Sequence, residues 1–369
     1  MIQRSSARHV AIVGTSLDIL GGQGVQACRL IEGLEAEGIR VTFIPINPRF
    51  PRVLGWVRRL PVVRTVLNQL IYLPSLVRMW KADVTHVFSG SYWSFLLAPV
   101  PALIVGRCLN KHVVLNYHSG EADDHLSHWG RLVHPWLGLA HDLVVPSQYL
   151  RSVFAQFGYS ARVVPNVVDV SRFQYRARLP LRPRLLSTRN LEPYYRVDLV
   201  IQAFARFSRE VPDATLTIAG YGSQERHLRA LVTSLGCNGV RFLGRVEADD
   251  MPRLYGDHDI FVNASVLDNQ PVSILEAFAS GLAVVSTMAG DIPDMVRNGE
   301  TGMVAAADAA DLAGAISRVW NDPDGSRAMT RRARAALTRY TWAMVRDEWI
   351  DIYSERTRLD EIVIGAESR

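Results

Sequence analysis

The sequence predicts an α/β protein with two domains, each built on a parallel sheet covered by helices. Its 369 residues are too many for one ordinary hydrophobic core and suit two. The chain opens as a βαβ unit, and a second series of apolar strands begins at Arg184, after a stretch rich in Arg and Pro that lacks periodicity. We therefore expect a first domain over residues 1–173, a linker over 174–184 and a second domain over 185–344.

Apolar strands outline both expected domains. The first has a Gly-rich turn and a helix from about Val25 to Glu37, and its strands are expected at His9–Gly14, Val41–Ile46, Val84–Phe88, His112–Tyr117 and Leu143–Pro146. The second has a helical tail from Asp311 to Arg358, and its strands are expected at Arg184–Ser187, from Leu216, and at Val240–Val246, Asp259–Val262 and Leu282–Val285. A dinucleotide site is not expected, because the first turn lacks G-x-G-x-x-G and the second strand does not end in an acid.

The composition indicates a globular protein of a reducing compartment. Hydrophobic residues make up 48% of the chain and charged residues 21%, as in soluble proteins. The cysteines Cys28, Cys108 and Cys237 show neither zinc nor disulfide spacing. The N-terminus enters a strand without a signal-peptide apolar region, and the longest apolar stretch, residues 95–105, is too short to span a bilayer. We expect a cytoplasmic location.

The basic charge is concentrated in one block of the first domain. Residues 1–170 carry 16 basic and 10 acidic residues, whereas the rest carries 25 and 26. From Arg49 to Lys81 there are seven basic residues and no acidic one, with Trp56 and Trp80 among many apolar side chains. This pattern is typical of an anionic membrane surface binder. The alternative is a pair of helices packed on the sheet with a solvated Arg face; no nucleic-acid motif accompanies the block.

The stretch DNQPVSILEAFASG, residues 268–281, places two acids around a helix start. Pro271 suits the first helical position and Gly281 ends the helix. Asp268 lies in the loop before the helix, and Glu276 lies eight residues on, within it. Free N–H groups at a helix start favour phosphate, and carboxylates accept hydrogen bonds from sugar hydroxyls. The segment therefore predicts a sugar-nucleotide site, with an ordinary capped amphipathic helix as the alternative.

This motif resembles the donor site of the family 4 glycosyltransferases, in which two acids eight residues apart precede a similar helix end and an apolar strand. Those are retaining enzymes of the GT-B fold, with two Rossmann-like domains facing across a cleft and a C-terminal helix that crosses back to the first domain. The resemblance implies this fold here, with residues 345–369 packing on the first domain. The chain departs from the motif by carrying Asp268 instead of Glu and Pro271 instead of Gly.

Further segments resemble the family in the same order. The segment Pro165–Phe173 matches the end of its first domain. Arg189 matches an Arg that grips the donor diphosphate, and the family's following Lys-Gly falls on Tyr195 and Arg196. Residues 289–296 match Gly-Gly-x-x-Glu with Asp at its second Gly and at its Glu.

The resemblance implies a complete set of site residues. The catalytic residues are Asp268 and His118. The donor contacts are Gly22, Arg189, Asn190, Arg196, Gly220, Gly222, Asn269, Gln270, Val272, Ser273 and Glu276. The acceptor contacts are Gly21, Gly22, Glu121 and Asp123. No cofactor or metal is expected, since the five histidines between His118 and His141 fit no standard metal signature.

The sequence therefore predicts a hexosyltransferase-type enzyme. It would move a sugar, with retention, from a nucleotide-diphosphate sugar to a glycan or lipid-linked acceptor in polysaccharide or glycoconjugate synthesis. Residues 49–81 would attach it peripherally to the inner membrane face, and nucleic acid is not an expected partner. The alternative is a non-catalytic GT-B-like binding or partner subunit, which the departures at Asp268, Pro271 and Tyr195 favour.

Overall fold

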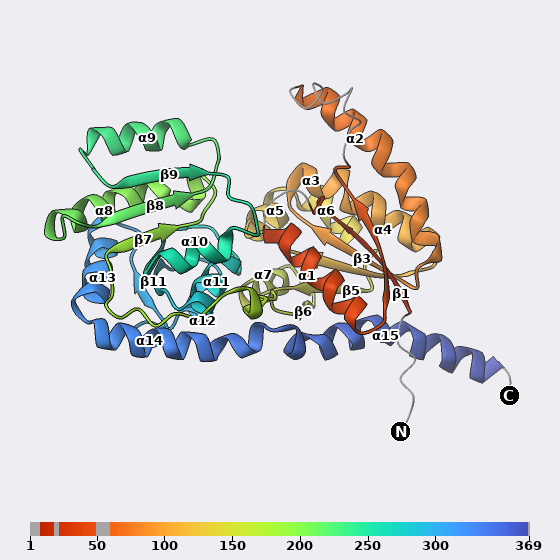
Figure 1. Cartoon of the computed structure of the whole chain (residues 1–369). Helices are drawn as coiled ribbons and strands as arrows, with labels where there is room; N and C mark the ends of the chain where they lie inside the picture. The colour runs from red at the N-terminus through yellow and green to blue at the C-terminus, as the bar shows by residue number, and fades with distance from the viewer. Residues whose placement is uncertain (1–7, 18–21, 49–59, 368–369) are drawn as a thin grey trace. The chain divides into compact units, whose positions relative to one another are not determined.

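The computed structural model describes residues 8–17, 22–48 and 60–367, and the chain divides into two compact units (Figure 1). Unit 1 comprises residues 1–167 and 342–369, and unit 2 comprises residues 168–341. Each unit holds one six-stranded parallel sheet with helices on both faces, so the predicted fold class of two Rossmann-like α/β domains is confirmed. No helix in the described ranges is long and apolar enough to cross a membrane.

The sheet of unit 1 has the strand order β2-β1-β3-β4-β5-β6. Three of its strands, β1, β3 and β4, are buried along their whole length, as expected for parallel strands covered on both faces. The order reverses between β1 and β3, which marks the point where such sheets bind ligands at their carboxyl edge. The strand bounds are β1 His9–Gly14, β2 Arg40–Pro45, β3 Val84–Ser89, β4 His112–Tyr117, β5 Asp142–Val145 and β6 Arg162–Val163.

Two helix layers cover the unit 1 sheet. Helix α1 and the C-terminal helix α15 pack on one face around Leu30, Leu34, Trp349 and Ile352. The other helices pack on the opposite face around residues such as Phe95. The helix bounds are α1 Gly22–Ala36, α2 Pro61–Ser75, the 3-10 helix η2 Leu76–Lys81, α3 Tyr92–Leu97, α4 Pro99–Cys108, α5 Ala122–His128, α6 Gly130–Leu137, α7 Gln148–Gln156 and α15 Trp342–Glu367.

The sheet of unit 2 has the strand order β12-β11-β10-β7-β8-β9. The order reverses between β7 and β10, whose residues Leu186 and Phe261 are paired in register. This arrangement corresponds to the strand order of the dinucleotide-binding Rossmann sheet. The strand bounds are β7 Arg184–Ser187, β8 Thr215–Ala219, β9 Val240–Gly244, β10 Ile260–Asn263, β11 Ala283–Thr287 and β12 Met303–Ala305.

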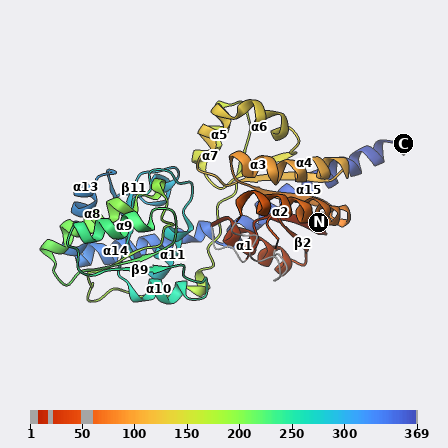
Figure 2. The same ribbon diagram turned by 90° about the horizontal axis from the view of Figure 1, so that it is seen from above.

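Helices α8, α9 and α13 cover one face of the unit 2 sheet, and α10, α11 and α12 cover the other (Figure 2). The segment α14 contributes Met329 to the first core and Ala333 to the second. The helix bounds are η3 Val170–Arg172, η4 Pro193–Tyr195, α8 Val197–Glu210, α9 Glu225–Ser234, α10 Met251–Asp257, α11 Val272–Ser280, α12 Ile292–Met295, α13 Ala309–Asn321, α14 Pro323–Ala336 and η5 Leu337–Tyr340.

The predicted strands are observed with shifts of one or two residues at their ends. Two short edge strands, β6 and β12, were not predicted, because two or three residues carry too little periodicity. Pro271 occupies the N-cap of α11 and not the first helical position, a shift of one residue. Gly281 ends α11 with φ 79°, as predicted for a helix stop.

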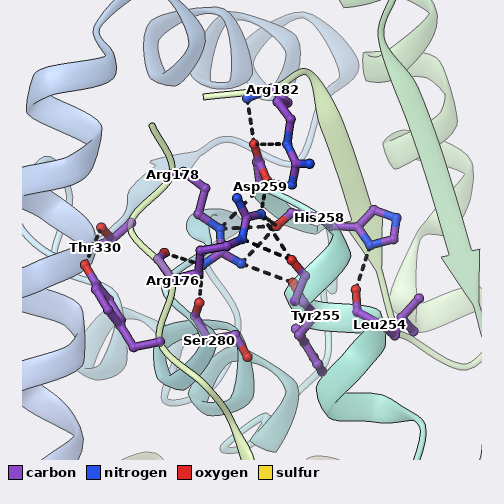
Figure 3. A network of polar contacts seen from close by, with 11 residues as sticks. Arg176, Arg178, Arg182, Leu254, Tyr255, His258, Asp259, Ser280 and Thr330 are labelled. Atoms are coloured by element: carbon purple, nitrogen blue, oxygen red, sulfur yellow. Dashed lines mark hydrogen bonds and ion pairs between the residues drawn. The ribbon is translucent and has the colours of Figure 1, made fainter. Parts of the chain in front are cut away.

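Residues 174–183, which are most of the linker predicted over 174–184, are bound within unit 2 through one buried carboxylate (Figure 3). Arg184, the last residue of the predicted linker, begins β7. Asp259, fully buried just before β10, pairs with Arg176 at 2.5 Å and Arg182 at 2.9 Å. Arg178 lies between them and donates to the carbonyl oxygens of Tyr255, His258 and Ser280. These ion pairs and hydrogen bonds hold the segment against the amino end of β10.

Candidate functional site

The switch point of unit 2 brings together two residues that are 79 positions apart in the sequence. Arg189 follows β7, and Asp268 lies in the loop between β10 and α11. Arg189 Nη2 lies 2.6 Å from Asp268 Oδ2, and both side chains are 10% exposed. Arg189 Nη1 also donates to the hydroxyl oxygen of Ser273, at 3.2 Å, in the first turn of α11. The diphosphate cation and the loop acid expected from the sequence are therefore direct partners.

An aromatic ring supports the Arg189 guanidinium. Its central carbon lies 4.1 Å from the centre of the Tyr195 ring, in η4, a cation–π distance. Burial disfavours the charged form of Arg189, but the Asp268 carboxylate together with Tyr195 and Tyr255 more than offsets this, so the pKa of Arg189 is raised. Tyr195, at the position where the resemblance expects Lys, therefore contacts the cation and does not supply one.

Glu276 belongs to the same cluster through Tyr255. The Tyr255 hydroxyl lies 2.9 Å from Thr188 Oγ1 and donates to the carbonyl oxygen of Ser273 at 3.2 Å. Its pKa is raised well above the ordinary value by burial first and by the carboxylate of Glu276 next. Tyr255 and Thr188 were not predicted, because the only sequence signal for Tyr255 was its place in the apolar pattern of α10.

The loop after Asp268 packs against the turn that contains Gly290 and Asp291. Gly290 has φ 52°, and a Cβ there would lie 2.1 Å from the carbonyl oxygen of Asp268, so glycine is required by both conformation and space. Asp291 donates its backbone N–H to the carbonyl of Asn269 at 3.0 Å, and its side chain accepts from Gln270 at 3.0 Å. The side chains of Asn269 and Gln270 are thus buried in this turn, and Val272 begins α11 directly after it.

The glycines at 220 and 222 let the turn after β8 approach the loop that carries Arg189. A Cβ on Gly220 would lie 2.2 Å from the Arg189 carbonyl oxygen, beside Asn190, and one on Gly222 would lie 2.5 Å from that of Leu191. The backbone N–H of Leu191 donates to the carbonyl of Tyr221 at 3.0 Å. The absence of side chains at these two glycines therefore allows the close backbone packing that positions Arg189.

The structure places Arg196 differently from Arg189. Arg196 is the N-cap of α8 with φ 47°, a left-handed conformation. Its guanidinium pairs with Asp198 at 3.0 Å in the first turn of that helix. The family's Gly falls on this position, and a left-handed N-cap explains why glycine suits it.

In unit 1, His118 lies directly after β4 and its backbone N–H donates to Ser89 at the end of β3. Burial lowers the pKa of His118 to about 3, so its imidazole is neutral at physiological pH. A cavity beside it is lined by residues of α1, β3, β4, residues 164–167 and α15, including Gln26, Asn116 and Trp349.

The expected acceptor residues are distributed around the same edge. Glu121 lies 3.4 Å from the Ser91 hydroxyl, which also bonds to Ser119 at 2.5 Å. Asp123 is exposed in the first turn of α5, and Gly22 begins α1. Gly21 lies outside the described residues. Among the described residues no group of three or more His, Cys, Asp or Glu side chains is arranged to hold a metal ion.

Two units, each with a six-stranded parallel sheet and helices on both faces, define the class of two-domain α/β proteins with the GT-B fold. Family models match both units: "Glycosyltransferase Family 4" over residues 20–172 and "Glycosyl transferases group 1" over residues 182–322. The chain belongs to the family 4 glycosyltransferases and is an enzyme of the hexosyltransferase type.

Individual relatives cover nearly the whole chain. It is 28% identical to a glycogen synthase of Mycobacterium tuberculosis, across 94% of this chain and 90% of the relative. It is 27% identical to a GDP-mannose-dependent alpha-(1-6)-phosphatidylinositol monomannoside mannosyltransferase of Mycolicibacterium smegmatis, across 82% and 84%. The Anabaena protein Alr3699/HepE, solved with UDP and glucose, superposes with a TM-score of 0.71 at 18% identity, across 94% and 99%. This last likeness shows the fold.

Proposed function

We propose that the protein transfers a hexose from a nucleotide-diphosphate sugar, with retention, to a glycan or lipid-linked acceptor in polysaccharide or glycoconjugate synthesis. The observation that supports this most directly is the contact of Arg189 with Asp268 and Ser273 at the switch point of unit 2. Relatives named for GDP-mannose and a structural neighbour solved with UDP support a nucleotide-sugar donor without naming the base.

In the proposed reaction, the bond from the anomeric carbon to the diphosphate breaks, a bond to an acceptor oxygen forms on the same face of the sugar, and the proton of the acceptor hydroxyl passes to the leaving diphosphate. Arg189 neutralises the leaving diphosphate, because a fixed cation stabilises charge where it develops. Glu276 accepts hydrogen bonds from the ribose, and Asp268 accepts one from the hexose. His118 serves as a neutral hydrogen-bond partner for a sugar hydroxyl. With Arg189 in this role, we expect the reaction to proceed without a metal.

The direct test is a thermal-shift screen against UDP-, GDP- and ADP-sugars, followed by an assay for released nucleoside diphosphate. A bound donor raises the unfolding midpoint by mass action. We expect one donor to do so and to be turned over, with activity unchanged in EDTA and the product keeping the donor's anomeric configuration. Failure of every donor to bind would overturn the proposal, and an inverted product would overturn its stereochemistry.

We further propose that unit 1 docks on an anionic membrane surface through α2 and η2. Of the basic block, Arg49, Arg52, Arg58, Arg59 and Trp56 lie outside the described residues, whereas Arg64, Arg78 and Lys81 are exposed. Only Tyr72, Leu76 and Met79 of α2 and η2 are buried among the side chains that the structure describes. The exposed apolar side chains of this segment are Leu60, Val62, Val63, Val66, Leu70, Ile71, Leu73, Val77 and Trp80.

A solvated Arg face does not account for this exposed apolar surface, because exposed patches of this kind mark interaction sites. Each cation near an anionic leaflet contributes on the order of 1 kcal/mol, and the apolar side chains add insertion into the interface. We expect co-sedimentation with anionic liposomes that high salt weakens and that Leu70→Glu with Trp80→Glu abolishes. The matched control is Met288→Glu, an exposed apolar position in unit 2. Equal pelleting of all variants would overturn membrane docking.

A further inference from the structure

The two cations expected at the diphosphate site are both already paired with carboxylates. Arg189 is paired with Asp268 and Arg196 with Asp198. The first pair is nine-tenths buried, so separating it without a replacement anion would leave a buried, uncompensated charge. A diphosphate that binds Arg189 must therefore compete with Asp268.

Arg189 also holds one unused donor. Its Nε is buried, and no atom among the described residues accepts a hydrogen bond from it. A buried donor without a partner costs free energy, and a phosphate oxygen would satisfy it. Nη1 and Nη2 of the guanidinium are on a hydroxyl and a carboxylate, whereas Nε has no partner among the described residues. A phosphate oxygen can therefore contact Nε first and then displace Asp268, since two anions on one buried cation repel each other.

We propose that Asp268 is a positioning residue for Arg189 that the donor diphosphate replaces on binding. In the free enzyme, Asp268 holds the guanidinium in place. When the diphosphate takes Arg189, the Asp268 carboxylate is released and becomes an acceptor for a hydroxyl of the donor sugar. This inference rests on the proposed function and deepens it, since it makes the sugar contact conditional on diphosphate binding.

Tyr195 is the second positioning residue. Its ring stays 4.1 Å from the guanidinium and carries no charge that the diphosphate would displace. Cation–π contact does not compete for the N–H donors at the edge of the guanidinium, so the ring holds Arg189 while its ionic partner changes. A Lys at this position would instead repel Arg189.

The replacement of Asp268 by the diphosphate at Arg189 predicts different affinities for the nucleoside diphosphate product and the nucleotide-sugar donor. A nucleoside diphosphate must break the Arg189–Asp268 pair and offers nothing to the released carboxylate. A nucleotide sugar breaks the same pair but supplies a hydroxyl to Asp268. Removing the charge at 268 therefore removes a competitor for the first ligand and a binding partner for the second.

The experiment is isothermal titration of UDP, GDP, UDP-glucose and GDP-mannose into the wild type and Asp268→Asn, together with kcat and KM. We expect Asp268→Asn to bind the nucleoside diphosphate on the order of tenfold more tightly, because a charged competitor has been removed. The ratio of its affinity for the nucleotide sugar to its affinity for the nucleoside diphosphate should be smaller than in the wild type. Its kcat should fall. A merely structural role would weaken both ligands and leave their ratio unchanged.

Three controls decide the outcome. Asp213→Asn makes the same charge change at an exposed position before β8 and should leave both affinities unchanged. Tyr195→Ala should weaken diphosphate binding several-fold, and Tyr195→Phe should restore it, since the ring alone is needed. If the wild type binds a nucleotide but Asp268→Asn binds the diphosphate equally or more weakly, the replacement of Asp268 by the diphosphate is wrong and the proposed function stands. If the wild type binds none of the four ligands and no ADP-sugar either, both are wrong.

Discussion

In each unit, a segment outside the sheet is held against the strands by polar contacts, but the chemistry of those contacts differs. In unit 1, α15 docks through a neutral network: His86 Nδ1 lies 2.8 Å from the Tyr353 hydroxyl, and Asn116 lies 3.2 Å from the other His86 nitrogen. In unit 2, residues 174–183 dock through the charged Asp259 network (Figure 3). Segments can thus be bound to similar sheets by neutral or by ionic contacts. The two kinds of contact should lose their stabilising effect under different conditions.

The largest effect is expected from removing the charge of Asp259, which tests whether ionic contacts stabilise unit 2. Asp259→Asn leaves Arg178 buried with no carboxylate beside it, and breaking a buried ion pair costs about 3–5 kcal/mol. Burial lowers the pKa of Arg178 only to about 10, so it stays charged at neutral pH. We expect a loss of this size in the free energy of unfolding of unit 2, measured by urea denaturation with hydrogen exchange resolved by peptide.

The control for this variant is Asp249→Asn, whose carboxylate is fully exposed and pairs with Arg172. It should change stability little, because exposed ion pairs contribute little. An equal effect of the two variants would mean that the Asp259 network does not hold unit 2 together.

The sequence predicted the strands and the two parallel sheets, because these depend on local periodicity. It also predicted Asp268 in the loop before α11 and Glu276 within that helix, because the spacing is short. It did not predict the Asp259 network, because the three arginines read as a polar linker until the fold brings Asp259 beside them, 77 to 83 positions away. The direct contact of Arg189 with Asp268 was missed for the same reason. The exposure of the apolar side of α2 depends on which face packs on the sheet, which the sequence left open.

The second comparison is between Arg189 and Arg196, the two arginines expected at the diphosphate site. Arg189→Ala should lower kcat/KM on the order of a hundredfold, because charge-assisted bonds to the leaving phosphate are lost. Arg196→Gly should lower it much less, because the Arg196 side chain is 35% exposed and lies on Asp198, outside the buried contact of Arg189 with Asp268. Steady-state kinetics with the donor found in the screen tests this, and similar losses for both variants would place Arg196 in the diphosphate site as well.

Acid should weaken unit 1 before unit 2. Burial lowers the pKa of His86 and His118 to about 3 and that of His125 to about 4. The unfolded chain, with histidine pKa values near 6.5, binds these protons first, so stability falls as the pH drops below about 6.5 towards the folded values. Between pH 7 and 5.5 the loss is roughly 1 kcal/mol per histidine.

Unit 2 also has a histidine whose pKa is lowered by burial, His258, so it loses some stability in the same range, but less than unit 1 with its three. The carboxylate of the ionic network in unit 2 responds in another range. Asp259 has a lowered pKa, since the hydrogen bonds from Arg182 and Arg176 outweigh the burial that favours the neutral acid. A depressed carboxyl pKa contributes stability that is present above the unfolded value near 4 and lost only below it. Peptide-resolved hydrogen exchange at pH 7 and 5.5 should therefore show the greater loss of protection in unit 1. Equal losses would mean that the neutral network does not govern the acid response of unit 1.

The smallest expected effect concerns backbone strain at the carboxyl edge of each sheet. Unit 1 has Tyr92 there with φ 54°, held by a 2.5 Å bond from its hydroxyl to Asp124, and unit 2 has Arg196 with φ 47°. A non-glycine residue in this conformation costs roughly 1–2 kcal/mol, which glycine avoids. Glycine adds about 0.5–1 kcal/mol of unfolded-chain entropy, and losing the partly exposed Asp198 pair costs up to about 1 kcal/mol.

These terms nearly cancel, so Arg196→Gly should change the free energy of unfolding by less than about 0.5 kcal/mol. The matched control is Arg206→Gly, an exposed position inside α8 with ordinary helical geometry, where the same replacement should cost about 1 kcal/mol. Urea denaturation of both variants measures the difference. Equal destabilisation would show that Arg196 is not strained and that its left-handed conformation has no energetic consequence; a smaller loss for Arg196→Gly would assign the difference to the backbone at the start of α8.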